Sequence, residues 1–258
     1  MKLLVNGISG FMGREVARLA TEGYRGSSLS IGVDLASGVY DTAPIYAGFD
    51  AVPEDAEIDC IIDFSHHTAT AALLDFATSR GIPTVVATTG HDEAEIEAIN
   101  RASELIPVFH SANMSLGVAL LVGLAKTAAL AMPDADIEIV EKHHTRKLDA
   151  PSGTALMLAR AICEVRPDAY TNCARSGHGK RDKNEIGIHA LRLGNIVGEH
   201  EVILSTGTET ITLKHEAHSR ALFAEGAIAA AAFLVGMPQG LYNMQSLIDG
   251  TADNTTVV

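Results

Sequence analysis

The 258-residue sequence is poor in cysteine, and its three cysteines, Cys60, Cys163 and Cys173, lie far apart. Because no C-x-x-C pair is present, the usual structural zinc site is excluded, and we expect reduced thiols rather than a disulfide framework. The longest near-continuous apolar stretch covers residues 226–237, well short of the ~20 residues that span a bilayer. The chain reaches a glycine at Gly7, which leaves no room for the apolar region of a signal peptide. We therefore expect a cytoplasmic protein without a membrane anchor.

Basic residues are also scarce: 19 Lys and Arg oppose 32 Asp and Glu, which gives a formal net charge of −13. This charge disfavours binding to nucleic acid or to an anionic membrane through the overall field. With 47% hydrophobic and 20% charged residues, the composition is typical of a folded globular protein. At this length folding buries roughly 70–75% of the surface of the unfolded chain, enough for one large core or two smaller ones.

The first half of the chain alternates short apolar runs with amphipathic segments. We expect strands in the runs, which are rich in apolar and β-branched residues, as strands buried on both faces are. These runs cover residues 2–6, 29–33, 60–64, 84–87 and 106–109, and helical periodicity fills residues 13–21, 68–80 and 92–104. The alternation implies right-handed crossovers and predicts an α/β fold with a Rossmann-like, doubly wound parallel sheet.

The pattern changes after residue 114 and predicts a second, smaller α+β domain. Helices are expected at 116–132 and 155–165, and a strand at 137–141. Three further strands, at 186–193, 199–205 and 209–215, are joined by turns that contain glycine and predict an antiparallel meander. An alanine-rich helix at 221–235 has the composition of an element that docks on another layer, and we expect it to return to the first domain.

A glycine loop directly follows the first predicted strand and opens the first helix. Glycines at such a place permit a tight turn and a close approach of the backbone to a pyrophosphate, and the helix start offers N–H groups to phosphates. An ordinary turn would match the glycines alone, but the strand–loop–helix context predicts a dinucleotide site. The loop consists of Gly7, Ile8, Ser9, Gly10, Phe11, Met12 and Gly13.

Asp34 ends the second predicted strand and stands where an acidic residue accepts hydrogen bonds from the ribose of a dinucleotide. The alternative is an ordinary turn residue. Its neighbour Leu35 and the loop residue Phe11 supply no cation for a 2′-phosphate, so the residues favour NADH, with NADPH used less well.

Two polar segments follow the fourth and fifth predicted strands. Ligands of open α/β sheets bind beyond the carboxyl ends of the strands, so both segments are placed to meet the nicotinamide end of a cofactor. The alternative for each is a simple polar loop. The segments are Ala87, Thr88 and Thr89, and Ser111, Ala112, Asn113 and Met114.

Residues 141–154 hold two imidazoles, the ammonium group of Lys147 and a helix start close together in sequence. His143 can supply a proton near neutral pH, and Lys147 can donate a proton or neutralise a carboxylate. The run Ser152, Gly153 and Thr154 can present N–H groups to a carboxylate at the start of a helix. The alternatives are a solvated basic strand end and a plain capping motif. We predict no metal site, because His143 and His144 would point to opposite sides of a strand and no third ligand stands at a usual spacing.

The segment E-K-H-H-T-R-K-L-D-A-P-S-G-T-A at residues 141–155 resembles the signature of the 4-hydroxy-tetrahydrodipicolinate reductase family, formerly called dihydrodipicolinate reductases. The resemblance covers nearly the whole chain and includes the glycine loop, the A-T-T-G turn and the A-N-M-S-L-G-V stretch. It continues through residues 186–192, 198–200, 215–220 and 223–228.

The resemblance implies reduction of a cyclic dicarboxylate by a reduced nicotinamide, with loss of water, on the diaminopimelate route to lysine. His143 would then donate or relay the proton, Lys147 would be the proposed acid, and His144 would hold substrate carboxylates with Ser152, Gly153 and Thr154. Residues 1–114, with 220–258 returning to them, would bind the dinucleotide. Residues 115–219 would bind the substrate and build a homotetramer through their sheet.

Four positions depart from the common family pattern. Leu35 stands where a basic residue often follows the acidic one, and Phe11 stands where Arg or Lys often precedes Met-Gly. Both departures argue against NADPH. Met114 replaces a frequent Phe beside the nicotinamide, and Ala87 replaces a Gly.

Two other classes of protein compete with this interpretation. A two-domain dehydrogenase of an amino or hydroxy acid would share the glycine loop, but it would not need His-His-x-x-Lys joined to Ser-Gly-Thr. A cofactor-sensing binding module would keep the loop from Gly7 to Gly13 and Asp34, but it would not need two proton donors beside an anion site.

Overall fold

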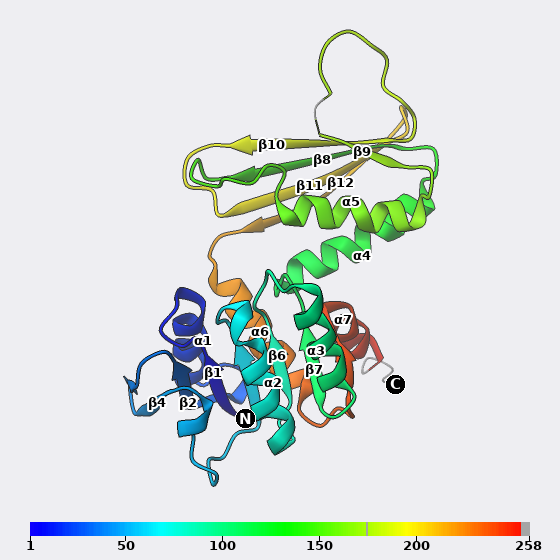
Figure 1. Cartoon of the computed structure of the whole chain (residues 1–258). Coiled ribbons are helices and arrows are strands. Elements are labelled where there is room, and N and C mark those ends of the chain that lie inside the picture. The colour runs from blue at the N-terminus through cyan, green and yellow to red at the C-terminus, as the bar shows by residue number, and fades with distance from the viewer. Residues whose placement is uncertain (174, 254–258) are drawn as a thin grey trace. The chain divides into compact units, whose positions relative to one another are not determined.

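The computed structural model describes residues 1–173 and 175–253, and the chain divides into two compact units (Figure 1). Unit 1 comprises Met1–Leu116 together with the chain from Ala221 onward, and unit 2 comprises Gly117–Arg220. In the described part of the chain, no helix combines the length and the apolar character that a membrane span requires.

Unit 1 is built on an eight-stranded sheet in the order β13-β7-β6-β5-β1-β2-β4-β3. Neighbouring strands are parallel apart from β3 and β4, which confirms the predicted doubly wound sheet. The central strands β1, β5 and β6 are almost completely buried, as their unbroken apolar runs require. The strands are β1 Lys2–Asn6, β2 Ser28–Asp34, β3 Gly38–Tyr40, β4 Ala43–Ala47, β5 Cys60–Asp63, β6 Thr84–Val86, β7 Pro107–His110 and β13 Gly240–Tyr242.

Helices cover both faces of this sheet, with α2 and α3 on one side and α1 and α6 on the other (Figure 1). A capping box begins α3, because the Asp92 side chain accepts from the Glu95 N–H and the Glu95 side chain accepts from the Asp92 N–H. The helices are α1 Phe11–Thr21, α2 Thr70–Arg80, α3 Glu93–Ser103, α6 Ala221–Leu234 and α7 Met244–Asp253.

Unit 2 is a five-stranded sheet in the order β12-β11-β8-β10-β9, with α4 and α5 packed on one face. Every second residue of β8 is buried, and two of these residues, Ile137 and Ile139, pack in one core with the two helices. The elements are α4 Leu116–Ala131, β8 Asp136–His143, α5 Gly153–Val165, β9 Tyr170–Asn172, β10 Glu185–Arg192, β11 Gly198–Ser205 and β12 Thr210–Ala217.

The predicted antiparallel meander is wrong in one respect. β11 and β12 form the expected antiparallel pair, but β8 lies between β10 and β11 and pairs with both, parallel to β10 and antiparallel to β11. A meander assumes that strands consecutive in sequence are neighbours in the sheet. Residues 193–197 are long enough to pass over one strand, since two strand spacings amount to only about 10 Å.

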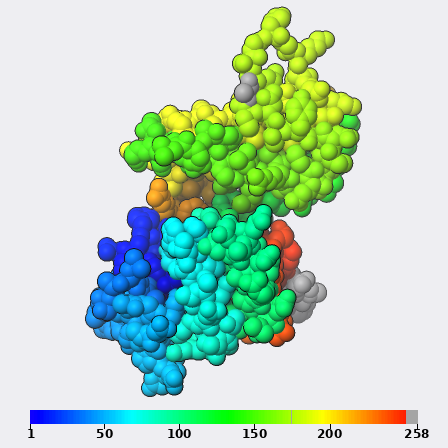
Figure 2. Space-filling view, in the orientation of Figure 1, coloured from blue at the N-terminus to red at the C-terminus, as the bar shows by residue number. Residues whose placement is uncertain are grey.

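The chain between β9 and β10 extends away from the sheet of unit 2, as Figures 1 and 2 show for residues 175–184. Arg181 anchors its return, because its guanidinium donates to the Asp136 and Glu138 carboxylates at 2.8 and 3.0 Å and to the Ile137 carbonyl at 2.9 Å. The start of β8 is therefore tied to the chain that enters β10.

Candidate active site

The glycine loop of unit 1 has the geometry of a phosphate cradle. Gly7 has φ +76°, a left-handed conformation that favours glycine, and a Cβ there would lie 2.6 Å from the Phe64 carbonyl oxygen. A Cβ on Gly13 would lie 2.1 Å from the Gly7 carbonyl oxygen, so the first turn of α1 packs directly on the loop. Gly10 is the N-cap of α1 and places no side chain over the first N–H groups of the helix. The loop therefore fits the pyrophosphate of a dinucleotide.

Asp34 is tied to this loop by hydrogen bonds. The Ser9 N–H donates to Asp34 Oδ2 and the Leu35 N–H donates to Oδ1, each at 2.8 Å. A carboxylate has about four acceptor positions, so further positions can take ribose hydroxyls. Leu35 is 99% exposed and Phe11 is 65% exposed, and neither side chain carries a charge.

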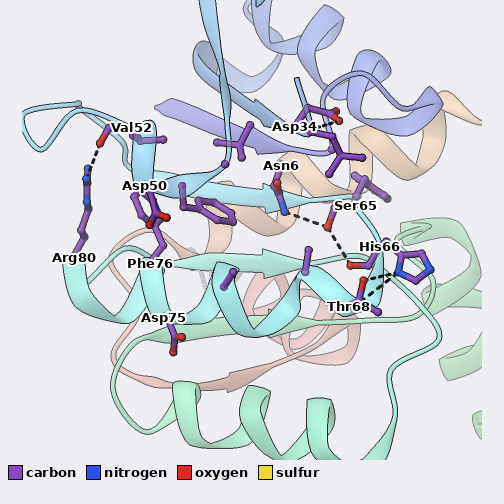
Figure 3. Close-up of a pocket in the computed structure, with 18 of the residues that line it drawn as sticks. Asn6, Asp34, Asp50, Val52, Ser65, His66, Thr68, Asp75, Phe76 and Arg80 are labelled. Carbon is purple, nitrogen blue, oxygen red and sulfur yellow. Dashed lines mark hydrogen bonds between the residues drawn. The ribbon is translucent and has the colours of Figure 1, made fainter. Parts of the chain in front are cut away.

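A groove of about 1470 Å³ runs from the glycine loop along α2 (Figure 3). This volume exceeds the ~300–1,000 Å³ of pockets for small ligands, as a dinucleotide would need. The lining includes the carboxylates of Asp34, Asp50, Glu54 and Asp75. Arg80 also lines the groove, but its guanidinium donates to the carbonyls of Val52 and Pro53 at 3.0 and 2.8 Å. The groove is therefore acidic on balance.

Asp63, at the end of β5, is a buried carboxylate that was not among the predicted site residues. Its Oδ1 accepts from Asn6 Nδ2 at 2.8 Å and from Ser65 Oγ at 2.6 Å, and its Oδ2 accepts from Thr88 Oγ1 at 2.7 Å. These bonds join the carboxyl ends of β1 and β5 to the A-T-T-G turn. The signal available in the sequence was an acidic residue directly after three apolar ones, Cys60, Ile61 and Ile62.

The predicted nicotinamide-end segments lie at the carboxyl ends of β6 and β7, which are neighbours in the sheet. Residues 87–89 and 111–114 do not belong to the described lining of the groove at Asp34. The Met114 side chain is buried within unit 1, and Thr88 directs its hydroxyl to Asp63. What these two residues can offer a ligand is therefore chiefly backbone.

In unit 2, Glu141 and His143 project from β8 into one buried cluster. The two residues are two positions apart on a strand, so their side chains share a face. His143 Nδ1 lies 2.6 Å from Glu141 Oε2, and both side chains are buried. His200 on β11 stands beside them, with its ring centroid 5.2 Å from that of His143. Burial lowers the pKa of His200 to about 4, which keeps this imidazole neutral.

Ser152 caps α5 and joins it to this cluster. Its N–H donates to Glu141 Oε1 at 3.0 Å, its Oγ accepts from the Ala155 N–H at 3.2 Å, and its Oγ lies 3.0 Å from His200 Nε2. The residue is 2% exposed, so its polar groups serve the protein interior. Gly153 follows it and is exposed, and apart from its chain neighbours and the backbone of its own helix no heavy atom lies within 4 Å of where a Cβ would lie. An anion at this helix start would therefore meet the backbone of Gly153 and Thr154.

Cationic groups lie near His144, the residue directly after β8. Desolvation lowers the pKa of His144 first, and the positive charges of Arg146, Arg220 and Lys147 lower it further. Its backbone N–H donates to the Ile196 carbonyl at 2.8 Å, while its buried Nδ1 has no hydrogen-bond partner among the described residues. Lys147 forms an ion pair with Asp149 at 2.9 Å. This group of cations suits a ligand that carries carboxylates.

The described residues contain no group of three or more His, Cys, Asp or Glu side chains that could hold a metal ion. Glu141, Arg192 and His200 also belong to the buried cluster without having been predicted as site residues, although each lies in a stretch that resembles the family. Glu141 could have been found from the period of a strand, which places it on the same face as His143.

A glycine-loop unit with a dinucleotide groove, followed by a sheet unit with a buried histidine beside a helix start, defines the class of two-domain nicotinamide-dependent oxidoreductases. The fold is similar to that of a diaminopimelate dehydrogenase from Corynebacterium glutamicum, with a TM-score of 0.59, 14% identity and 99% of each chain covered. It is also similar to a dipicolinate-bound dihydrodipicolinate reductase from Paenisporosarcina sp. TG-14. There the TM-score is 0.80 and the identity 22%, over 94% of this chain and 97% of that one.

Within this class the chain belongs to the dihydrodipicolinate reductase family. The family's N-terminal model matches residues 1–114, and its C-terminal model matches residues 117–248. The chain is 46% identical to the 4-hydroxy-tetrahydrodipicolinate reductase of Caldanaerobacter subterraneus subsp. tengcongensis and 42% identical to that of Clostridium novyi. Each match covers 96% of this chain and 98% of the relative. The resemblance predicted from the motifs is thus confirmed.

Proposed function

We propose that this chain is a nicotinamide-dependent reductase that converts 4-hydroxy-tetrahydrodipicolinate into tetrahydrodipicolinate in lysine and diaminopimelate biosynthesis. The observation that carries the proposal is the buried Glu141–His143 pair beside the capped start of α5, with Lys147 and His144 close in sequence. A substrate with two carboxylates that must accept a proton matches this set of groups. The names of the relatives and the dipicolinate bound to the solved structure support the assignment.

A bound reduced nicotinamide supplies the hydride of this reaction, a proton comes from the protein, and the 4-hydroxyl group of the substrate is lost as water. In unit 2, the N–H groups of Gly153 and Thr154 bind one substrate carboxylate, and Lys147 and His144 bind the other. Ser152 holds the helix start in place through its bonds to Glu141 and His200. His143 donates or relays the proton, and Lys147 is the second acid within reach of the same substrate.

In unit 1, the residues from Gly7 to Gly13 hold the phosphates and Asp34 accepts the ribose hydroxyls. Residues 87–89 and 111–114 hold the nicotinamide end through their backbone. We propose NADH as the preferred cofactor. Four carboxylates line the groove, and the guanidinium of Arg80 is engaged by backbone carbonyls, so a 2′-phosphate would enter an acidic site.

We also propose that the protein is a cytoplasmic homotetramer assembled through the sheet of unit 2. The face that α4 and α5 do not cover carries Val140, Leu191 and Ile203, and Leu191 is 39% exposed. Apolar side chains on an open sheet face favour contact with a second copy. Light scattering at micromolar concentration should give the mass of four chains, and a monomer mass would contradict this part of the proposal.

The reductase activity is tested by following the loss of NADH absorbance while the preceding aldol enzyme of the pathway generates the substrate. The expected result is consumption that depends on both enzymes. Absence of turnover, with NADH still bound, would favour a cofactor-sensing module. Turnover only with an amino or hydroxy acid would favour another dehydrogenase.

A further inference from the structure

Glu141 is a fully buried carboxylate whose acceptor positions are filled from three directions. Arg192 on β10 donates two hydrogen bonds to this carboxylate, from Nη1 to Oε2 at 2.8 Å and from Nη2 to Oε1 at 2.7 Å. The Ser152 N–H donates to Oε1 at 3.0 Å, and His143 Nδ1 lies 2.6 Å from Oε2. Burial raises the pKa of Glu141, but the bonds from Arg192, His143 and Ser152 outweigh burial and lower the pKa overall. Glu141 is therefore ionised and has no acceptor to spare for a substrate.

An ionised carboxylate can only accept hydrogen bonds, which decides where the imidazole proton lies. The 2.6 Å contact requires a proton on His143 Nδ1, so in the neutral ring Nε2 is the unprotonated nitrogen. The Nε2 edge of the ring faces Gly198, where a Cβ would lie only 3.0 Å from Nε2. A glycine at this place therefore leaves room beside the nitrogen that exchanges protons.

Arg192 allows the His143 imidazolium to release its proton, because its charge offsets that of Glu141. A buried carboxylate alone beside an imidazole would hold the imidazolium strongly and make it a poor proton donor. The guanidinium offsets that charge, so the pair as a whole is close to neutral while its geometry still orients the ring. The Arg192 guanidinium also donates to the Asp149 carbonyl at 2.6 Å, which ties the pair to the loop that carries Lys147.

We propose that Glu141 and Arg192 form a positioning pair that fixes the proton of His143 on Nδ1 and leaves Nε2 as the atom that takes up and delivers the proton. The inference rests on the proposed function, because that function assigns the proton to His143. Neither Glu141 nor Arg192 touches the substrate in this scheme. The titratable groups that interact with His143 are Glu141 on β8, His200 on β11 and the adjacent His144. Arg192 on β10 bonds Glu141, and the charge of Lys147 acts on His144 and His200.

The first test is the position of the proton in the protein without substrate. Nitrogen-15 NMR of histidine-labelled protein distinguishes the two ring nitrogens, and a His143→Gln sample identifies the His143 signals among the 11 histidines. The expected result is a protonated Nδ1 in the neutral ring of the wild type and a mixture of tautomers in Glu141→Gln. A protonated Nε2 in the wild type would overturn the proposal, whatever reaction the protein catalyses.

The second test is the pH profile of turnover. Glu141→Gln removes the carboxylate and leaves Arg192, so the alkaline limb should move to lower pH by roughly one unit or more. Arg192→Gln leaves the charge of the Glu141 carboxylate without a cation beside it, so the alkaline limb should move to higher pH. Arg192→Lys should return the limb to its position in the wild type. A purely structural role would lower turnover in both variants without opposite shifts, and that outcome would overturn the proposal.

Glu138→Gln is the matched control. Glu138 is on the same strand and also bonds an arginine and a histidine, Arg181 at 3.0 Å and His189 at 2.8 Å, but these lie outside the cluster of His143. The pH profile of turnover of Glu138→Gln should follow that of the wild type. An equal shift in Glu138→Gln would contradict the proposal. If His143 carries its proton on Nδ1 but the protein does not reduce the substrate, the proposed function is refuted and the positioning pair is not.

Discussion

Asp34 and Leu35 are neighbours at the end of β2 with opposite chemistry, a carboxylate tied to the glycine loop and an exposed alkyl chain. Like charges at roughly 4–6 Å, with an effective dielectric near 20, repel by several kcal/mol before screening. Salt and side-chain rotation reduce this, so we expect NADH to be preferred over NADPH by about tenfold or more in kcat/KM. Leu35→Arg should narrow the ratio by adding a partner for the 2′-phosphate.

The matched control is Leu105→Arg, which adds the same charge at another exposed leucine. It should leave the cofactor ratio unchanged. A wild-type ratio at or below one would contradict the preference. Arg14 would then have to be considered as the cation that reaches the phosphate, because Lys2 is paired with Glu57.

The two proton donors should respond differently to truncation. His143→Ala should lower kcat by about 10²–10⁴-fold with little change in NADH binding, since it removes an acid or proton relay. Lys147→Ala should lower kcat and raise the KM for the substrate together, because an ammonium acts on the bound carboxylate in both ground and transition states. Steady-state kinetics and NADH titration check both results. Near-native turnover in both variants would show that the proton comes from elsewhere.

At the scale of single elements, the start of α5 is the expected carboxylate site. Gly153→Val should raise the KM for the substrate, because the added side chain would cover the N–H groups of the first turn. The fold should stay intact, since nothing outside the chain neighbours and the backbone of its own helix lies within 4 Å of the position of a Cβ at Gly153. Thermal unfolding of the variant controls for the fold. Unchanged kinetics would place the carboxylate at another element.

At the scale of the whole molecule, buried histidines make stability depend on pH. The pKa of His200 is about 4 in the folded protein against 6.5 for the free side chain, so the unfolded chain binds more protons between these values. The neutral His200 makes its full contribution to the free energy of unfolding above pH 6.5, and this contribution is lost as the pH falls toward 4. Between pH 7.5 and pH 5 the free energy of unfolding should fall by about 2 kcal/mol because of this residue.

The measurement is the urea midpoint of unfolding, followed by circular dichroism at the two pH values. His200→Gln should lose part of the pH dependence, because the glutamine has no proton to gain. His178→Gln makes the same change at an exposed position and should keep the dependence of the wild type. Equal pH dependence in the wild type and in His200→Gln would contradict the assignment.

Much of this protein follows from its sequence alone. The apolar runs before Gly7, at residues 60–62 and at residues 84–86 determine a parallel sheet, because only strands covered on both faces can be apolar throughout. Local structure requires the glycines at positions 7 and 13. Gly7 has a left-handed backbone conformation, and at Gly13 the first turn of α1 packs directly on the loop. The motif from Glu141 to Thr154 identifies the family, because its chemical groups are close together in sequence.

Tertiary structure alone decided the rest. The insertion of β8 between β10 and β11 could not be predicted, because a strand pairs with whichever neighbour completes its buried face and not with the next strand in sequence. Arg192 and His200 reach Glu141 and Ser152 from strands about 50 residues away in sequence. Asp63 likewise meets Asn6 and Thr88 only where three strand ends converge. Hydrogen bonds act over about 3 Å in space, so no pattern along the chain records them.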